Sequence, residues 1–72
     1  MNNWEVGKLY RIKLDGGVEF ITKCVLEYTT PRGEYSVFQI LIITENSFME
    51  HWKIGERMSL RREMTDIKVT KI

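Results

Sequence analysis

The stretch Tyr35–Thr44, YSVFQILIIT, decides the fold of this chain. Apolar and β-branched side chains fall on both faces of this stretch when it is extended, which is typical of a strand that is covered on both sides. The β-branched residues favour a strand over a helix, and the turn signal Pro31-Arg32-Gly33 just before them supports this choice. We therefore expect a central strand with two alternating faces: Val37, Gln39, Leu41 and Ile43 on one, and Phe38, Ile40, Ile42 and Thr44 on the other.

Two strands are expected before the central one. Residues 9–14 alternate apolar and basic side chains, and the glycines of Asp15-Gly16-Gly17 favour a tight hairpin after them. Residues 18–28 alternate again over a length that suggests a bent strand. Pro31 and Gly33 then predict a loop over residues 29–34. The inward face of the second strand is expected to carry Val18, Phe20, Thr22, Cys24, Leu26 and Tyr28.

The residues after the central strand predict two shorter strands. Residues 45–52 break the alternation, and Asn46 or Ser47 is a suitable cap for one helical turn. Residues 57–61 predict a strand with Met58 and Leu60 inward, and residues 62–66 are polar enough for a tight turn or one 3₁₀ turn. Residues 67–72 predict a last strand with Ile67 and Val69 inward. The order is therefore all-β and antiparallel, with a short helical turn or loop before the fourth strand.

Short motifs recur at strand boundaries along nearly the whole chain. Val6-Gly7 and Ile54-Gly55 precede strands, Leu14-Asp15-Gly16 closes the first one, and Asp66-Ile67 opens the last. In these features the chain resembles the small barrels of the Src-homology-3-like (SH3-like) and Sm-like class. The resemblance implies one domain over residues 1–72, folded as a small five-stranded antiparallel SH3-like barrel. It implies no role for any individual residue.

Length and composition indicate one small soluble domain. The chain has 72 residues, 43% hydrophobic and 29% charged, so it is expected to fold around a thin core. Eleven basic and ten acidic residues give a net charge of +1, which provides no global field for attracting nucleic acid or a membrane. Any charged site must therefore come from a local arrangement of side chains.

Catalytic, metal and targeting signals are absent from the sequence. His51 is the sole histidine and is read as a solvated loop residue, while Cys24 lies in phase with Phe20 and is read as a small buried hydrophobe. One histidine and one cysteine offer no zinc spacing, so we expect neither an enzyme nor a bound metal or cofactor. Residues 1–8 lack a signal-peptide pattern and the longest apolar run is Ile40–Ile43, so we expect a cytoplasmic protein without membrane contact.

The first functional hypothesis is a noncatalytic protein that binds another protein. Aromatic and methionine side chains outside the alternating strands suit the centre of an interface. The competing interpretation is that Phe48 and Trp52, four residues apart, close one end of the barrel. An adaptor or inhibitor, such as the compact accessory proteins of phages and mobile elements, has this profile by analogy. The candidate protein-binding residues are Tyr35, Phe48, Met49 and Trp52.

The alternative hypothesis is a nucleic-acid-binding barrel with a basic strand face. If the first and last strands are neighbours, Arg11 and Lys13 join Lys68, and the fourth strand adds Arg57 and Arg61. Acidic residues scattered through the same elements favour a mixed solvated surface instead. A fainter alternative is a small nucleotide-like ligand at the barrel end. The second apolar face of residues 35–44 also suggests a homodimer or small ring.

Overall fold

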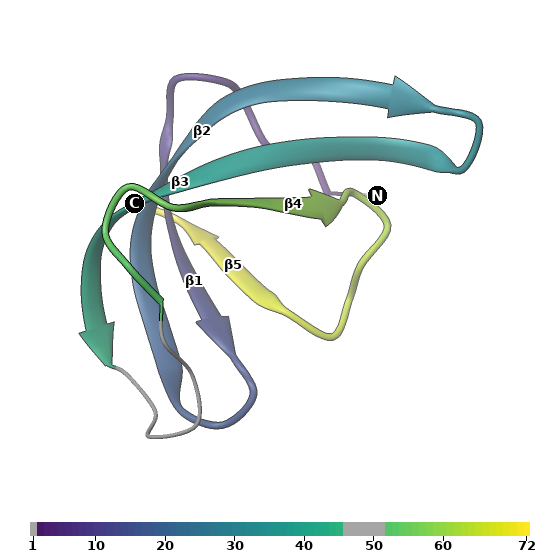
Figure 1. The fold of residues 1–72 in the computed structure, drawn as a ribbon. Helices are drawn as coiled ribbons and strands as arrows, with labels where there is room; N and C mark the ends of the chain where they lie inside the picture. The colour runs from purple at the N-terminus through teal and green to yellow at the C-terminus, as the bar shows by residue number, and fades with distance from the viewer. Residues whose placement is uncertain (1, 46–51) are drawn as a thin grey trace.

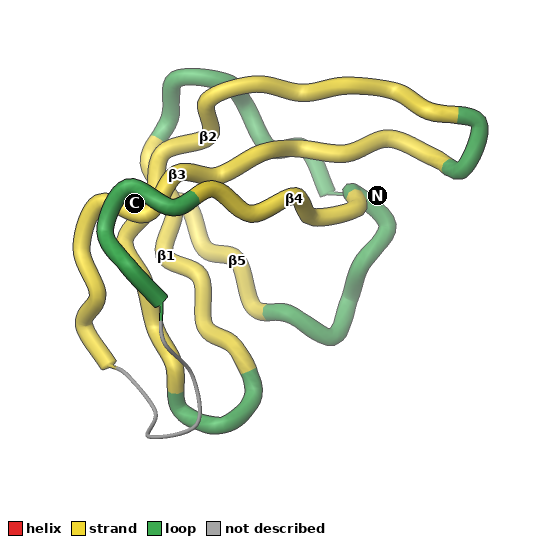
Figure 2. Tube along the Cα trace, in the orientation of Figure 1, coloured by secondary structure: helices red, strands yellow, loops and turns green. Residues whose placement is uncertain are grey.

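The computed structural model describes residues 2–45 and 52–72, which form an all-β fold without helix. Figure 2 shows strands and loops only. Residues 46–51 lie outside the described ranges, and with them the predicted helical turn and the candidates Phe48, Met49 and His51. The five strands are β1 (Leu9–Leu14), β2 (Val18–Thr30), β3 (Gly33–Glu45), β4 (Arg57–Arg61) and β5 (Lys68–Lys71).

The strands form one antiparallel sheet in the order β4-β3-β2-β1-β5 (Figure 1). The predicted closure into a barrel is wrong, because no ladder between the described residues joins the two edge strands, β4 and β5. Both edge strands are short, and each pairs with a single neighbour over four or five residues. The sheet instead bends strongly (Figure 1), and the core cluster contains residues of β1, β2, β3 and β4.

A β-bulge at Val25 reverses the alternation of β2. Cys24 lies opposite Phe38 and Leu26 lies opposite Val37, so Val25 is an extra residue on β2. A bulge moves every later side chain to the other face of the strand. Leu26 and Tyr28, which the strict alternation predicted to point inward, are accordingly 39% and 40% exposed. The prediction holds from Val18 to Cys24 and is wrong beyond the bulge.

A second irregularity explains the two-sided apolarity of β3. Ile42 lies opposite Ile21 and Ile40 lies opposite Thr22, so Leu41 is the extra residue on β3. Ile40 is fully buried, whereas Ile42 is 53% exposed. Ile43, predicted to share a face with Val37, instead packs against the core. The extra residue at Leu41 changes which positions of β3 point inward. Counted in strict alternation, the apolar residues of β3 therefore fall on both faces.

Three edge-to-face ring pairs lie within or against the core. Trp4 and Tyr10 contact Phe38 edge-on, with ring centroids 5.3 and 5.7 Å away. Trp52 contacts Phe20 in the same way, with ring centroids 5.3 Å apart. Edge-to-face pairs of this kind add to the free energy gained by burial alone. The inward positions predicted for Met58 and Leu60 on β4 are confirmed.

The β2–β3 hairpin extends further than the sequence indicated. The predicted loop over residues 29–34 is wrong, because both strands continue to a turn formed by Pro31 and Arg32. Thr30 stabilises this turn: its Oγ1 accepts a hydrogen bond from the Arg32 N–H (3.1 Å) and donates one to the Gly33 carbonyl (3.3 Å). Because β1 pairs with β2 only as far as Lys23, residues 26–37 form a hairpin that extends past β1 (Figure 1). We call this segment the hairpin arm. Strand β4 borders the hairpin arm from Tyr35 to Val37, and only residues 29–34 extend past both neighbouring strands.

The buried position predicted for Cys24 is confirmed, and its reactivity follows from it. Burial, with a smaller contribution from the Glu27 carboxylate, raises the pKa of the Cys24 thiol above its ordinary value of 9.0. The unfolded chain loses this proton at a lower pH than the folded chain. The thiol therefore lowers the free energy of unfolding as the pH rises above the ordinary pKa of 9.0. A chromogenic disulfide reagent is therefore expected to label Cys24 only after denaturant is added.

The control for this labelling experiment is a second thiol at an exposed position of the same sheet. Ser59 on β4 is exposed, so the Ser59→Cys variant made in a Cys24→Ala background should react quickly without denaturant. Native labelling of Cys24 as fast as that of the Ser59→Cys thiol would show that the second strand opens readily and that its thiol is not protected.

Candidate functional site

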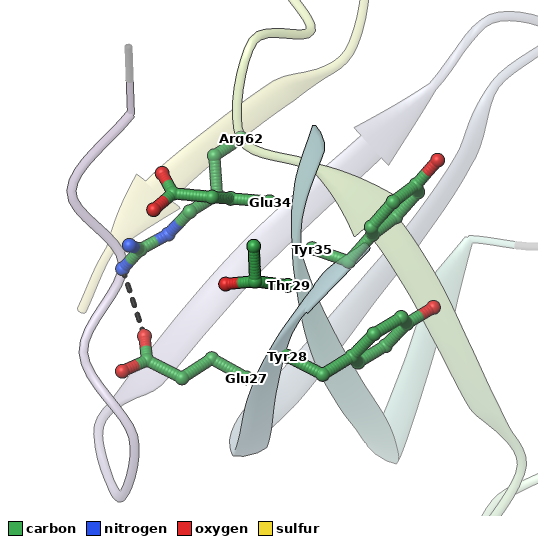
Figure 3. Close-up of a pocket in the computed structure, with 6 residues that line it drawn as sticks. All are labelled: Glu27, Tyr28, Thr29, Glu34, Tyr35 and Arg62. Atoms are coloured by element: carbon green, nitrogen blue, oxygen red, sulfur yellow. Dashed lines mark ion pairs between the residues drawn. The ribbon is translucent and has the colours of Figure 1, made fainter. Parts of the chain in front are cut away.

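Two stacked tyrosine rings lie on one face of the hairpin arm. Tyr28 on β2 is directly opposite Tyr35 on β3, and the rings are 5.1 Å apart with an interplanar angle of 7°. Figure 3 shows the two rings side by side, both pointing away from the carboxylates of Glu27 and Glu34. Two adjacent strands fix the backbone beneath them. We call these residues the tyrosine pair.

Apolar and cationic side chains border the tyrosine pair. Leu26 lies one pair further along the same face, opposite Val37, and is partly exposed. Arg61 on β4 is directly opposite Tyr35. Its guanidinium extends along the arm, donating a hydrogen bond to the Arg32 carbonyl (3.0 Å) and pairing with Glu63 (3.3 Å). We call the surface formed by Leu26, Tyr28, Tyr35 and Arg61 the arm face.

On the side of the arm opposite the tyrosine rings, polar side chains line a pocket of about 310 Å³, which Tyr28 and Tyr35 also border. Its polar side chains are Glu27, Thr29, Glu34 and Arg62 (Figure 3). The Arg62 side chain is only 16% exposed; its Nη2 contacts Glu27 Oε2 at 3.0 Å and donates a hydrogen bond to the Trp4 carbonyl at 2.7 Å. The Arg62 Nε atom is buried without a hydrogen-bond partner. The Arg62 guanidinium thus interacts mainly with other groups of the protein and offers few donors to a ligand.

The Arg62 backbone joins three distant segments. Its N–H donates to the Glu34 carbonyl at 3.0 Å, and its carbonyl accepts a hydrogen bond from Asn2 Nδ2 at 3.0 Å. The same amide nitrogen of Asn2 donates to the Met64 carbonyl at 2.8 Å. The N-terminal segment, the arm and the connection between β4 and β5 therefore meet at Arg62. We assign this side of the arm a structural role.

Of the four sequence-predicted protein-binding residues, the structure describes Tyr35 and Trp52. Tyr35 belongs to the arm face. Trp52 is partly buried and its ring packs on Phe20, which agrees with the competing interpretation that it covers the core. Phe48 and Met49 lie outside the described residues.

Three of the five predicted nucleic-acid-binding residues lie together. Because β1 pairs with β5, Lys13 is directly opposite Lys68 and Arg11 is directly opposite Thr70. These four residues and Glu19 line a groove of about 330 Å³, which we call the β1–β5 groove. Arg57 and Arg61 lie on β4, at the other end of the strand order, and Arg61 belongs to the arm face.

Two important residues were not identified from the sequence. Tyr28 was assigned to the interior, although a tight turn at Pro31 and Arg32 places it opposite Tyr35 by simple counting. Arg62 was read as part of a polar turn, and nothing near it in the sequence indicates its contacts with Asn2 and Trp4. The position of the turn could have identified Tyr28, whereas no sequence signal could have identified Arg62.

Within residues 2–45 and 52–72, no three acidic, histidine or cysteine side chains are placed to hold a metal ion. In the same part of the chain, no helix is long and apolar enough to cross a membrane. No protein family, curated protein or solved structure matches the chain. What is established is a small five-stranded antiparallel sheet, which is compatible with the small-barrel class.

Proposed function

We propose that this chain is a noncatalytic protein that binds another protein through its arm face. The observation that carries the proposal is the stacked tyrosine pair on the hairpin arm, in which Tyr28 is 40% exposed and Tyr35 is half-buried. Tyrosine and arginine are enriched among the residues that contribute most to protein interfaces. A rigid aromatic pair also offers contact area with little loss of side-chain entropy on binding.

The charges around the arm face suggest the chemistry of the partner. Arg32 at the arm tip and Arg57 at the start of β4 make no ion pair with any described residue, and Arg61 lies between them with Glu63 as its partner. An apolar and aromatic centre bordered by cations is complementary to an apolar pocket bordered by carboxylates. We therefore propose an acidic protein surface as the partner.

The wider assignment forms part of the same proposal. The order of the strands and the short connections are compatible with an SH3-like or Sm-like small barrel that has not closed. A chain of this size with a single interaction surface would act as an adaptor or an inhibitor, as accessory proteins of phages and mobile elements do, and would act in the cytoplasm. Self-association through the exposed Leu41 and Ile42 stays a prediction.

The test compares binding by the wild type with binding by a variant lacking the tyrosine pair. The immobilised wild type is expected to retain a specific acidic protein from cytosol, and the double variant Tyr28→Ser/Tyr35→Ser should lose it. The isolated partner should bind the double variant at least 30-fold more weakly by calorimetry, since hot-spot residues contribute about 2 kcal/mol or more.

The matched control is Ile54→Ser, which removes an exposed apolar side chain outside the arm. It should bind the partner as the wild type does, and far-ultraviolet circular dichroism should show that all variants are folded. Equal retention by the wild type and the double variant would overturn the proposal, and so would the recovery of nucleic acid alone.

A further inference from the structure

The β1–β5 groove contains two lysines in a position that is unfavourable in the absence of a ligand. Lys13 and Lys68 are directly opposite in an antiparallel pair, where side chains are about 5 Å apart at Cβ and like charges repel. Both residues are exposed, and neither makes an ion pair with any described residue. A bound anion would convert this repulsion into two attractive contacts.

The one carboxylate in the groove is already engaged. Glu19 contacts Arg11 Nε at 3.1 Å, and its side chain is 17% exposed compared with 57% for Arg11. Three cationic side chains and one carboxylate give the lining a formal charge of +2. Glu19 is also directly opposite Lys13 on β2, but its ion pair is with Arg11. It therefore orients one cation of the groove without forming an ion pair with either lysine.

The size and donors of the groove suit phosphate. Its volume of about 330 Å³ admits one or two phosphate groups. Lysine ammonium groups and arginine guanidinium groups both form charge-assisted hydrogen bonds with phosphate oxygens, and the Thr70 hydroxyl adds a neutral donor beside Arg11. The adjacent pairs Lys13–Lys68 and Arg11–Thr70 therefore present a row of donors along one face of β1 and β5.

We propose that the β1–β5 groove binds the phosphate groups of a nucleotide or of a single-stranded nucleic acid. Lys13 and Lys68 are the main phosphate ligands, and Arg11 and Thr70 extend the site along the strands. The proposal goes beyond protein binding by the arm face, because the two surfaces share no residue: the groove is formed by β1, β5 and the start of β2, and the arm face by the end of β2 with β3 and β4. Arg57 and Arg61 take no part in this site.

The test is a nuclear magnetic resonance titration of the ¹⁵N-labelled full chain with three probes: sodium pyrophosphate, ATP and a 12-nucleotide single-stranded RNA. All three are expected to shift the amide signals of β1 and β5. The double variant Lys13→Gln/Lys68→Gln should bind each probe at least tenfold more weakly. For RNA it should also reduce the magnitude of the slope of log affinity against log salt by about 1.4, because each lysine lost removes one phosphate contact to a single strand.

A matched control removes two lysines elsewhere. Lys8→Gln/Lys53→Gln has the same net charge as the groove variant, and its exposed lysines do not line the groove. Its affinity should change less than twofold. Pyrophosphate and RNA binding of similar strength would identify a site for an isolated phosphate group, whereas RNA binding that is much tighter would identify a backbone site.

Two results would overturn the proposal: equal losses in the two double variants, or no shift with any probe at millimolar concentration. The lysines would then serve only to keep the exposed edge strand β5 from pairing with other chains. The outcome is separable from that of the proposed function, because the variant Tyr28→Ser/Tyr35→Ser should retain phosphate binding unchanged.

Discussion

Replacing Phe38 with alanine is expected to remove about 4 kcal/mol of the free energy of unfolding. Phe38 is fully buried at the centre of β3 and contacts the rings of both Trp4 and Tyr10. Deleting its ring removes buried apolar area and leaves a cavity that two other aromatic side chains border. A domain of this size has a stability on the order of 5 kcal/mol, so the Phe38→Ala variant should be close to unfolding at room temperature.

Urea titration followed by tryptophan fluorescence and circular dichroism measures this loss. The matched control is Leu26→Ala on the neighbouring strand, where the side chain is partly exposed beyond the Val25 bulge. Its cost should stay below about 1 kcal/mol. Similar losses in the two variants would mean that the inward face of the sheet has been assigned incorrectly.

Alternation predicted the fold wherever a strand has no bulge. The bounds predicted for β1, the inward positions of Met58 and Leu60 and the burial of Cys24 all agree with the structure. Each of these follows from a period of two residues and one buried face. The glycine turn after β1 was equally readable, because tight turns impose local backbone requirements.

The bulges on β2 and β3 could not be predicted from the sequence of either strand alone. Whether Val25 or Leu41 becomes the extra residue depends on which register buries the larger total area with the partner strand. That choice is made by pairs of distant residues. It also determined the candidate site, because the bulge at Val25 places Tyr28 outside and beside Tyr35.

The positions of the basic residues relative to one another could be predicted only where the neighbouring strands could be predicted. The expectation that the first and last strands pair brought Arg11, Lys13 and Lys68 together, and β1 does pair with β5. Arg57 and Arg61 lie elsewhere because β4 is the opposite edge strand of an open sheet. Strand order therefore decides which cations can act on one ligand.

Replacing Arg62 with alanine is expected to lower the free energy of unfolding by about 2 kcal/mol. The substitution removes the hydrogen bond from Arg62 Nη2 to the Trp4 carbonyl and leaves that carbonyl, beside a buried indole, without its donor. The ion pair with Glu27 adds little, because the Glu27 side chain is 52% exposed. The unpaired Arg62 Nε already carries a desolvation cost in the folded state, which keeps the expected loss moderate.

The adjacent arginine provides a control of the same residue type. Arg61 is 45% exposed and pairs with the exposed Glu63, so Arg61→Ala should cost less than about 1 kcal/mol. Chemical unfolding of both variants measures the difference, and Arg62→Lys should restore only part of the stability because an ammonium group lacks the planar donors of the guanidinium. If Arg61→Ala costs as much as Arg62→Ala, then the contacts of Arg62 with Trp4 and Glu27 do not hold the N-terminal segment against the arm.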